Sequence, residues 1–537
     1  MAIPPITIAQ PSARVLGLLV FGLVSCSIDD RLVRVQSTET QPQQPAPIGM
    51  ETGGAASPVN PSSPGVPAAN EAATPPRLSF PDAVPAPFPS AGAAPPPASN
   101  GAPMAEGLSL DALDPSRTGV AFSGATCNVA AAGDINGDGR NDFLASAPGA
   151  AYALFRPQQL APASLSDIPL GLPGIVLELP ADDSCSTIDV AAAGDVNGDG
   201  LDDFIVASSY RRYEDEYGDG AVFVVFGGRE PRRIADSQLD TGSSDGFVIR
   251  TIGSSSLRGA AEGAGDQNGD GLDDIVISSS QGTFVVFGKR DFSSVVLLGI
   301  DGDGSQSVAY RPRGEELGTI QGGVANLGDL NADGLADLAL GDVYAAVGSE
   351  TSAGRVYVTW GSTVSPTGVS VDPTSGFVIN GTQANGRAGE IVGAAGDVNG
   401  DGIRDILIQG SPRLAMDGSR SGSLAHVVWG KTDPAPVDLA DIEAGRGGGF
   451  SILPRPQGTA ESYEVDSNTM LSPAGDVNGD GLADILIDSF NAGRTYVVFG
   501  RRETTPVTPE LSPPFLAGLT LLTPGGISAD GAGDVNG

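Results

Sequence analysis

The sequence is poor in several residue types on which common protein functions depend. Its 537 residues include one histidine and three cysteines, and only 5% are aromatic. Three cysteines cannot form a disulfide-rich scaffold, and a single histidine excludes zinc sites built on several histidines. His426 is therefore the only histidine that a Ser-His-Asp arrangement could use. A strand histidine is usually structural, and we expect no catalytic role for it.

Basic residues and long apolar runs are also scarce. Lys and Arg number 29 against 65 Asp and Glu, which gives a formal net charge of −36. Such a charge repels nucleic acid and anionic lipid surfaces. No run after the amino-terminal leader reaches the 18 apolar residues that suggest a membrane-spanning helix. Glycine is abundant at 76 residues, which favours short strands joined by tight turns over a helical fold.

The amino terminus has the pattern of an export signal. Val15–Val24 is an apolar run that follows Arg14 and is too short to span a bilayer. The adjoining Leu-Val-Ser-Cys that ends at Cys26 resembles the bacterial lipoprotein signal, in which this cysteine is lipidated. We therefore predict a lipoprotein-type signal peptide over residues 1–26 and a lipid-anchored protein of the bacterial envelope, at the surface or in the periplasm. The alternative is an uncleaved signal in which Cys26 is unmodified.

Residues 27–105 have a different composition. Seventeen of the 42 prolines lie between residues 41 and 105, where there is no hydrophobic period and almost no charge. Such a segment cannot bury enough surface to fold. We predict a disordered Pro/Ala-rich tether that precedes a globular region over residues 106–537.

That region repeats one short motif. GDINGDGRND begins at Gly133, and five variants follow before a seventh, GDVNG, begins at Gly533 and stops at the chain end. The leading aspartates are 58 to 79 residues apart, so each repeat is one supersecondary unit. A small-residue stretch precedes each motif, a β-rich run follows it, a third strand ends in an aromatic residue and glycine, and a fourth strand leads into the next unit. Four short strands per unit are typical of a β-propeller blade.

Each complete motif has the form Asp-x-Asn-x-Asp-Gly-x-x-Asp, which indicates a calcium loop. Calcium takes six to eight oxygen ligands, which side chains at positions 1, 3 and 5 and the backbone carbonyl at position 7 of such a loop supply. Position 12, where an EF-hand has glutamate, is apolar and falls in a predicted strand. The predicted ligands at positions 1, 3, 5, 7 and 9 are Asp134, Asn136, Asp138, Arg140, Asp142, Asp195, Asn197, Asp199, Leu201, Asp203, Asp266, Asn268, Asp270, Leu272, Asp274, Asp329, Asn331, Asp333, Leu335, Asp337, Asp397, Asn399, Asp401, Ile403, Asp405, Asp476, Asn478, Asp480, Leu482 and Asp484.

The alternative for these loops is a turn without an ion. Three carboxylates within nine residues repel one another unless a cation lies between them, which favours the metal site. Loop 4 is expected to be the weakest, because Ala332 replaces the glycine at position 4.

The arrangement resembles the FG-GAP repeats of the integrin α-chain β-propeller and its bacterial relatives, over about residues 117–537. The resemblance implies an all-β, seven-bladed β-propeller whose last blade is truncated here. It also implies about six Ca²⁺ ions in loops on the rim opposite the usual ligand-binding face, and no catalysis. The sequence offers no sign of a partner β-subunit or an inserted domain.

The expected function is therefore binding, not catalysis. We predict a calcium-binding, envelope-anchored module for adhesion or for contact with an unknown protein or polysaccharide, with no nucleic-acid partner. The alternatives are a polysaccharide lyase or hydrolase built on the same propeller, and a purely structural envelope protein. Cys127 and Cys185 occupy similar places in neighbouring repeats, and they form either a disulfide or two free thiols.

Overall fold

The computed structural model describes the repeat region in segments. These are residues 19–23, 108–109, 122–123, 128–155, 163–164, 174–180, 188–213, 216–240, 242–251, 257–279, 282–297, 307–312, 320–363, 369–371, 375–410, 413–414, 420–421, 425–453, 469–489, 494–508, 518–522 and 527–531. All of them belong to one unit of the chain, which comprises Met1–Cys26 and Pro103–Gly537. The six complete loops lie within these segments. Cys26, Cys127, Cys185 and the seventh motif lie outside the described residues.

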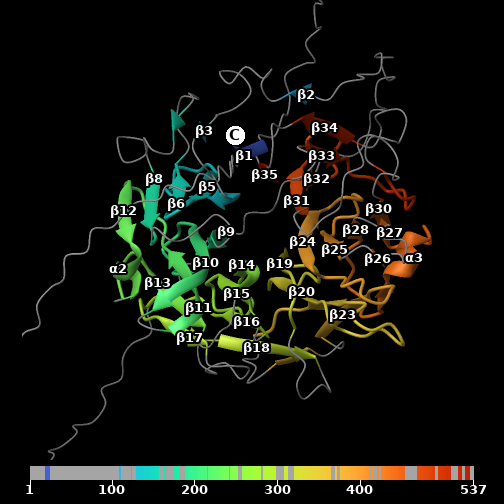
Figure 1. The fold of residues 1–537 in the computed structure, drawn as a ribbon, viewed down its shortest axis with the longest axis horizontal. Helices are drawn as coiled ribbons and strands as arrows, with labels where there is room; N and C mark the ends of the chain where they lie inside the picture. Colours follow the sequence, from blue (N-terminus) through green and yellow to red (C-terminus); the bar gives the residue numbers. More distant parts are fainter. Residues whose placement is uncertain are drawn as a thin grey trace, which may run out of the picture. The chain divides into compact units, whose positions relative to one another are not determined.

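Six sheets of four or five strands make up most of the described chain (Figure 1). The first contains β4 (Val129–Gly133), β5 (Asp142–Ala147), β6 (Ala150–Leu154), β8 (Gly174–Glu178) and β12 (Arg232–Ala235). The second contains β9 (Ile188–Gly194), β10 (Asp203–Tyr213), β11 (Glu216–Val225), β13 (Gly246–Thr251) and β17 (Val295–Leu297). The third contains β14 (Leu257–Gly265), β15 (Asp274–Ser279), β16 (Gly282–Val286), β18 (Ser307–Pro312) and β22 (Val369–Val371).

The other three sheets follow the same plan. The fourth contains β19 (Val324–Gly328), β20 (Asp337–Asp342), β21 (Arg355–Thr359), β23 (Gly376–Asn380) and β29 (Val437–Asp438). The fifth contains β24 (Ile391–Gly396), β25 (Asp405–Gln409), β28 (Ala425–Val428) and β30 (Gly449–Ile452). The sixth contains β31 (Thr469–Gly475), β32 (Asp484–Ser489), β33 (Arg494–Val498), β34 (Gly518–Leu522) and β2 (Leu108–Ser109).

Short elements complete the described fold. Three strand pairs are formed by β1 (Leu19–Leu23) with β35 (Ile527–Gly531), β3 (Phe122–Ser123) with β7 (Ala163–Ser164), and β26 (Arg413–Leu414) with β27 (Arg420–Ser421). The described helices are α2 (Asp236–Asp240) and α3 (Leu439–Glu443). The predicted all-β class is therefore confirmed. No helix among the described residues is long and apolar enough to cross a membrane.

Strand order shows how the repeats share their sheets. Within each sheet, the first four strands come from one repeat and pair antiparallel, as β9, β10, β11 and β13 do. In the first four sheets a fifth strand comes from the following repeat and pairs parallel, as β12 does with β8 and β17 with β13. The fifth sheet has four strands, and in the sixth sheet β2, which precedes the first repeat, pairs parallel with β34. The sequence predicted four strands per unit and missed this fifth strand.

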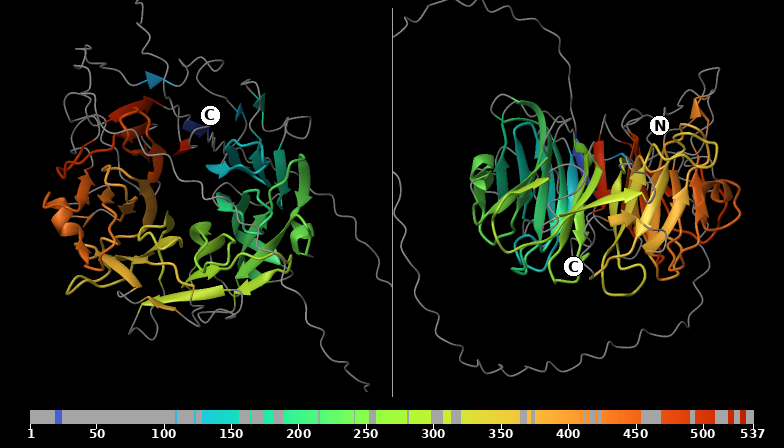
Figure 2. Two further views of the ribbon diagram at one scale, coloured as in Figure 1. Left: turned by 180° about the vertical axis from the view of Figure 1, so that it is seen from behind. Right: turned by 90° about the horizontal axis from the view of Figure 1, so that it is seen from below.

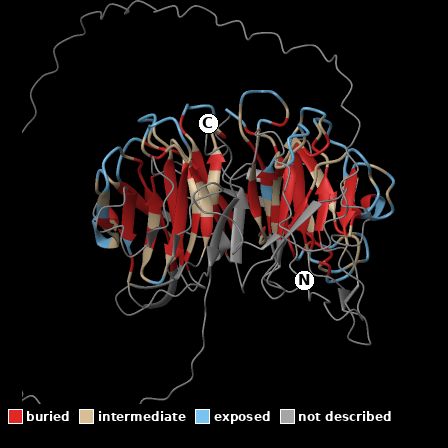
Figure 3. Cartoon of the chain, turned by 90° about the horizontal axis from the view of Figure 1, so that it is seen from above, coloured by how far each residue is buried: buried red, intermediate tan, exposed pale blue. Residues whose placement is uncertain are grey.

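Neighbouring sheets lie side by side with their first strands in contact (Figure 2). Thus β9 contacts β4 and β14, and β24 contacts β19 and β31. Buried residues fill the strands, whereas the exposed residues are mostly in the loops at their ends (Figure 3). The middle strands are buried on both faces, and β15 has no residue outside the buried class. This explains why these strands read as continuous apolar runs instead of alternating ones.

β1, which pairs with β35, lies within the predicted signal segment. Residues from Leu19 to Leu23 pair antiparallel with Gly531 to Ile527. β35 also contacts β31 and β4, so it lies between the first strands of the sixth and first sheets. The signal peptide over residues 1–26 stays a prediction, as do the tether and the domain boundaries.

Candidate metal centres

Each predicted calcium loop joins the first strand of a sheet to its second strand. Loop 3, for example, runs from the end of β14 at Gly265 to the start of β15 at Asp274. Its tight path depends on glycines with left-handed backbone, such as Gly269 with a φ of 77°. Because the connection is the same in every repeat, all six loops lie at the same end of their sheets.

The aspartate at position 1 organises the loop. In loop 3, Asp266 Oδ1 accepts hydrogen bonds from the backbone N–H groups of Gly269 at 2.6 Å and Asp270 at 3.2 Å. Asp266 Oδ2 accepts one from Gly271 N–H at 2.9 Å. The corresponding bonds to positions 5 and 6 recur in all six loops. These hydrogen bonds hold the position-1 carboxylate against the turn without the help of an ion.

The aspartate at position 9 is buried and ties the loop to the third strand. Asp274 is 0% exposed. Its Oδ2 accepts the N–H of Gln267 at 2.9 Å, and its Oδ1 accepts the N–H of Gly288 at 2.8 Å. Burial raises the pKa of Asp274 to about 8, and the charges of Asp270 and Asp266 add to the increase. No basic side chain in the described ranges neutralises this carboxylate, so a bound cation would fit its electrostatic requirement.

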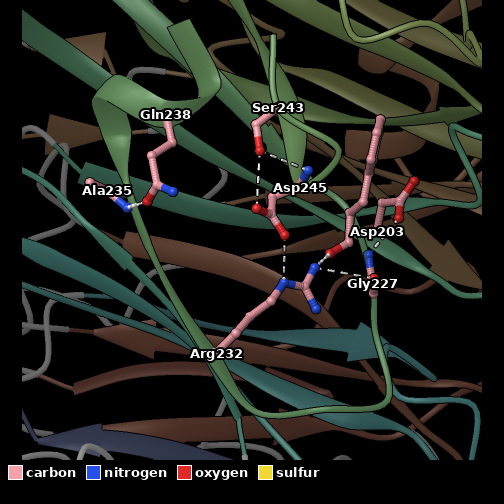
Figure 4. A network of polar contacts seen from close by, with 8 residues as sticks. Asp203, Gly227, Arg232, Ala235, Gln238, Ser243 and Asp245 are labelled. Atoms are coloured by element: carbon pink, nitrogen blue, oxygen red, sulfur yellow. Dashed lines mark hydrogen bonds and ion pairs between the residues drawn. The ribbon is translucent and has the colours of Figure 1, made fainter. Parts of the chain in front are cut away.

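Loop 2 shows the same link within a larger polar network (Figure 4). Asp203 Oδ1 accepts the N–H of Gly227 at 2.8 Å, and burial raises the pKa of Asp203 well above its ordinary value. Arg232 donates to the carbonyl of Gly227 at 3.3 Å and pairs with Asp245 at 2.9 Å. The aromatic residue and glycine that end the third strand therefore have a structural role in this repeat, because the glycine N–H donates to the position-9 carboxylate of the loop.

Positions 3, 5 and 7 form the outer part of the loop. In loop 3, Asn268 Oδ1 accepts the N–H of Asp270 at 2.8 Å, and Asn268 Nδ2 donates to Asp270 Oδ2 at 3.1 Å. Asp270 Oδ1 accepts the N–H of Leu272 at 2.9 Å. Asp270 is exposed, unlike the buried Asp274. Each loop thus combines exposed and buried oxygen donors within nine residues.

This donor set fits a hard cation such as Ca²⁺, because carboxylate, amide and carbonyl oxygens are the ligands that Ca²⁺ prefers. Within the segments listed above, however, no group of three or more His, Cys, Asp or Glu side chains is arranged to hold a metal ion. One physical reason is visible in loop 3, where the carboxylates of Asp266 and Asp274 face backbone N–H groups. The calcium sites and their residues therefore stay a prediction.

Consecutive loops are hydrogen-bonded to each other, which the sequence did not predict. Asp202, at position 8 of loop 2, donates its N–H to the carbonyl of Asp134 at 3.2 Å. The Asp202 carboxylate in turn accepts the N–H of Asp134 at 2.6 Å. Asp273 and Asp195 repeat both bonds between loops 2 and 3. The aspartate at position 8 of loops 2 and 3 was the available signal, although the predicted ligand set omitted it.

The loops differ in backbone strain and in the basic side chains that lie beside them. Ala332 in loop 4 has a φ of 62°, a conformation that glycine adopts without strain. A Cβ added to Gly328, before loop 4, would lie 2.8 Å from a guanidinium nitrogen of Arg404. Arg502 Nε donates to the Asn399 carbonyl in loop 5 at 2.8 Å. Guanidinium groups also lie beside Gly137 in loop 1 and Gly198 in loop 2, from Arg229 and Arg290. A cationic neighbour is therefore not particular to loops 4 and 5, whereas the strained backbone at Ala332 is particular to loop 4.

The structure gives no support to a hydrolase site in the described part of the chain. His426 is 8% exposed, and its Nε2 lies 3.2 Å from Glu443 Oε1, which links β28 to α3. Residues 242–246 match the pattern GxSxG of a hydrolase nucleophile turn, a match that the sequence analysis missed. Ser244 takes the nucleophile position of this pattern. The residues form a turn that leads from α2 into β13, whereas a nucleophile turn connects a strand to a helix.

Known proteins share the repeats. The FG-GAP repeat family matches residues 128–155 and 189–225, which include loops 1 and 2 and their flanking strands. Integrin alpha pat-2 of Caenorhabditis briggsae is 25% identical over 256 residues, which are 46% of this chain and 19% of that protein. Integrin alpha-IIb of Mus musculus is 26% identical over 193 residues, 35% of this chain and 16% of that protein. The match thus spans about a fifth of each relative's length.

Among solved structures, an Agrocybe aegerita lectin that recognises non-reducing terminal N-acetylglucosamine has a TM-score of 0.37 at 14% identity. That alignment covers 77% of this chain and 90% of the lectin. The family and integrin matches confirm the resemblance that the metal loops indicated. The chain thus contains segments that match the FG-GAP repeat family, and it is similar to integrin α-chains over part of its length.

Proposed function

We propose that this chain is a calcium-stiffened β-propeller that serves as a non-enzymatic adhesion or interaction module. The observation that carries the proposal is the sixfold recurrence of one loop at the same end of six sheets. Every copy has the same oxygen donors and the same position-1 hydrogen bonds. A turn that only reversed the chain would not require three carboxylates in each copy.

The propeller is supported by the sequence of contacts between first strands. β4, β9, β14, β19, β24 and β31 contact one another in this order, and β35 contacts both β31 and β4. β35 would then be the first strand of a seventh blade, whose metal loop begins at Asp534. We propose that the head is exported and held at the bacterial envelope through lipidated Cys26 and the tether that follows it.

Calcium would stabilise the head by mass action, because the unfolded loops do not preorganise their carboxylates. With a dissociation constant of about 0.1 mM and about 1 mM free ion, each site contributes about 1.4 kcal/mol. Calorimetry with and without chelator tests this, together with elemental analysis of bound calcium. A melting curve unchanged by chelator, with no calcium bound, would exclude the metal role.

Binding of glycan and protein arrays, each with and without chelator, tests the interaction role. Calcium-dependent binding is the expected result. Binding to no ligand class would favour a purely structural envelope protein. Release of unsaturated uronic-acid products from a polysaccharide would instead indicate a lyase.

A further inference from the structure

Tyr344 is one of two large hydrophobic side chains that are exposed in the described part of the chain, at 47%. It lies in the loop of residues 343–354, which joins β20 to β21. This loop connects the second strand to the third, whereas the metal loop connects the first to the second. Because the strands are antiparallel, Tyr344 lies at the end of the sheet opposite metal loop 4.

A second loop, residues 381–390 between β23 and β24, is bonded along the first. The N–H groups of Asn385 and Arg387 donate to the carbonyls of Thr351 at 2.8 Å and Ser352 at 3.0 Å. Glu350 Oε2 accepts the N–H of Ala384 at 3.0 Å. The buried alanines Ala345, Ala353 and Ala388 lie within the two segments. We call residues 343–354 and 381–390 the loop pair. The hydrogen bonds between them join the two loops into one continuous surface.

The loop pair holds backbone strain. Four described non-glycine residues have a left-handed φ, and three of them are here: Ser352 at 50°, Asn385 at 57° and Arg387 at 48°. This conformation costs an ordinary residue about 1–2 kcal/mol, and such strain gathers at functional sites. Stability alone would favour glycine at position 387. The arginine that stands there instead is exposed and lies over the Tyr344 ring, with its Cζ 5.9 Å from the ring centroid.

The guanidinium of Arg387 is available for a partner. Arg233, Arg250 and Arg446 each pair with a carboxylate, but no carboxylate pairs with Arg387 among the residues that the structure describes. A guanidinium that stacks on an aromatic ring keeps its in-plane N–H donors, which match a carboxylate in bidentate geometry. Tyrosine and arginine are also the residue types enriched in the energetic centres of protein interfaces.

We propose that the loop pair docks a protein partner that presents an Asp or Glu carboxylate to Arg387 and packs apolar atoms against Tyr344. This assignment rests on the proposed interaction role and names its surface. A protein is favoured over an acidic polysaccharide because of the charge of the chain. A net charge of −36 repels a chain of repeated carboxylates, whereas one carboxylate on a peptide surface is tolerated.

The test is selection of a random-peptide display library on the full chain in calcium, followed by affinity measurements on the enriched peptides. We expect enriched sequences that need an Asp or Glu and that lose at least about tenfold in affinity on Tyr344→Ala or Arg387→Gly. Arg387→Gly removes the guanidinium and relieves the strained φ, so its melting temperature should not fall. The matched control is Arg446→Gln, which removes another exposed arginine, one already paired with Asp441, and should leave affinity unchanged.

Enrichment of no acidic sequence, or equal binding by Arg387→Gly and the unchanged protein, would overturn the proposal. Polygalacturonate that binds the unchanged protein but not Arg387→Gly would also overturn it, because the site would then belong to an acidic polysaccharide. Each measurement is repeated in chelator. Peptide binding that depends on Arg387 but not on calcium would refute the calcium role of the proposed function and leave the docking site intact.

Discussion

Removal of calcium is expected to make folding stability depend on pH through the buried position-9 carboxyl groups. Burial raises the pKa of Asp274 to about 8, well above its ordinary value of 3.8. Between these two values the metal-free folded chain holds a proton that the unfolded chain has released. The free energy of unfolding then falls as pH rises, by about 1.4 kcal/mol per pH unit for each such proton.

The variant Asp274→Asn isolates this one proton, because asparagine does not titrate. Urea unfolding of both proteins in chelator, from about pH 5 to 7, should give slopes that differ by about 1.4 kcal/mol per pH unit. Loss of an acceptor for Gln267 or Gly288 N–H should lower the variant's stability by a further 1–3 kcal/mol, roughly independent of pH. Asp270→Asn, which removes an exposed carboxylate from the same loop, is the control. It should change the slope far less than Asp274→Asn does, because the charge of Asp270 only adds to an increase in the pKa of Asp274 that burial causes.

Calcium should cancel the effect, because the metal requires the ionised carboxylate. Binding near pH 7 should then release protons, which calorimetry detects when buffers of different ionisation enthalpy are compared. Equal slopes for the unchanged protein and Asp274→Asn in chelator would refute the reasoning, since Asp274 would already be ionised in the metal-free fold.

Three further predictions concern the differences between loops. Ala332→Gly should stabilise the metal-free protein by about 0.5–1 kcal/mol in urea unfolding, because relief of about 1–2 kcal/mol of strain outweighs the added freedom of glycine. Arg404→Ala should raise the calcium affinity of loop 4 by up to about fivefold in titration calorimetry, and less in high salt, since an exposed charge contributes about 0.2–1 kcal/mol. Asp202→Asn should weaken calcium binding at loop 1. If it acts through that loop, the double variant Asp202→Asn/Asp138→Asn should lose no more calcium affinity than Asp138→Asn alone.

Much of the fold was predictable because the repeat fixes it locally. A glycine and three aspartates at constant spacing define a turn, and the apolar residues on either side define the strands that it joins. Position 12 of loop 3, Ile277, was predicted to lie in a strand and lies within β15. The order of four strands per repeat followed from the same periodicity, without any long-range information.

The features that the sequence did not reveal depend on contacts between repeats. β12 pairs with β8, although more than fifty residues and the whole second metal loop separate them. The role of Asp202 appears only when loop 1 lies beside loop 2. Tyr344 and Arg387 belong to loops that do not recur in the repeat pattern, so periodicity gave no signal for them. Local patterns identify the unit, whereas its neighbours determine what lies beside each loop.

The bonds between loops affect what calcium would do. If each loop were isolated, an ion would stabilise only the turn between two strands of one sheet. Here the backbone of position 1 is bonded to position 8 of the next loop, as Asp195 is to Asp273 and Asp266 is to Ala336. An ion that holds the position-1 aspartate in place therefore also holds its backbone carbonyl, which accepts the hydrogen bond from position 8 of the next loop. Calcium would then restrain the angle between the sheets that these bonds join, and with it the spacing of the loops at their opposite ends. Among the described residues, the carbonyl of Asp329 has no such bond to position 8 of loop 5, so the fourth and fifth sheets are not joined in this way. The position of Arg387 over Tyr344 therefore depends on the hydrogen bonds within the loop pair itself.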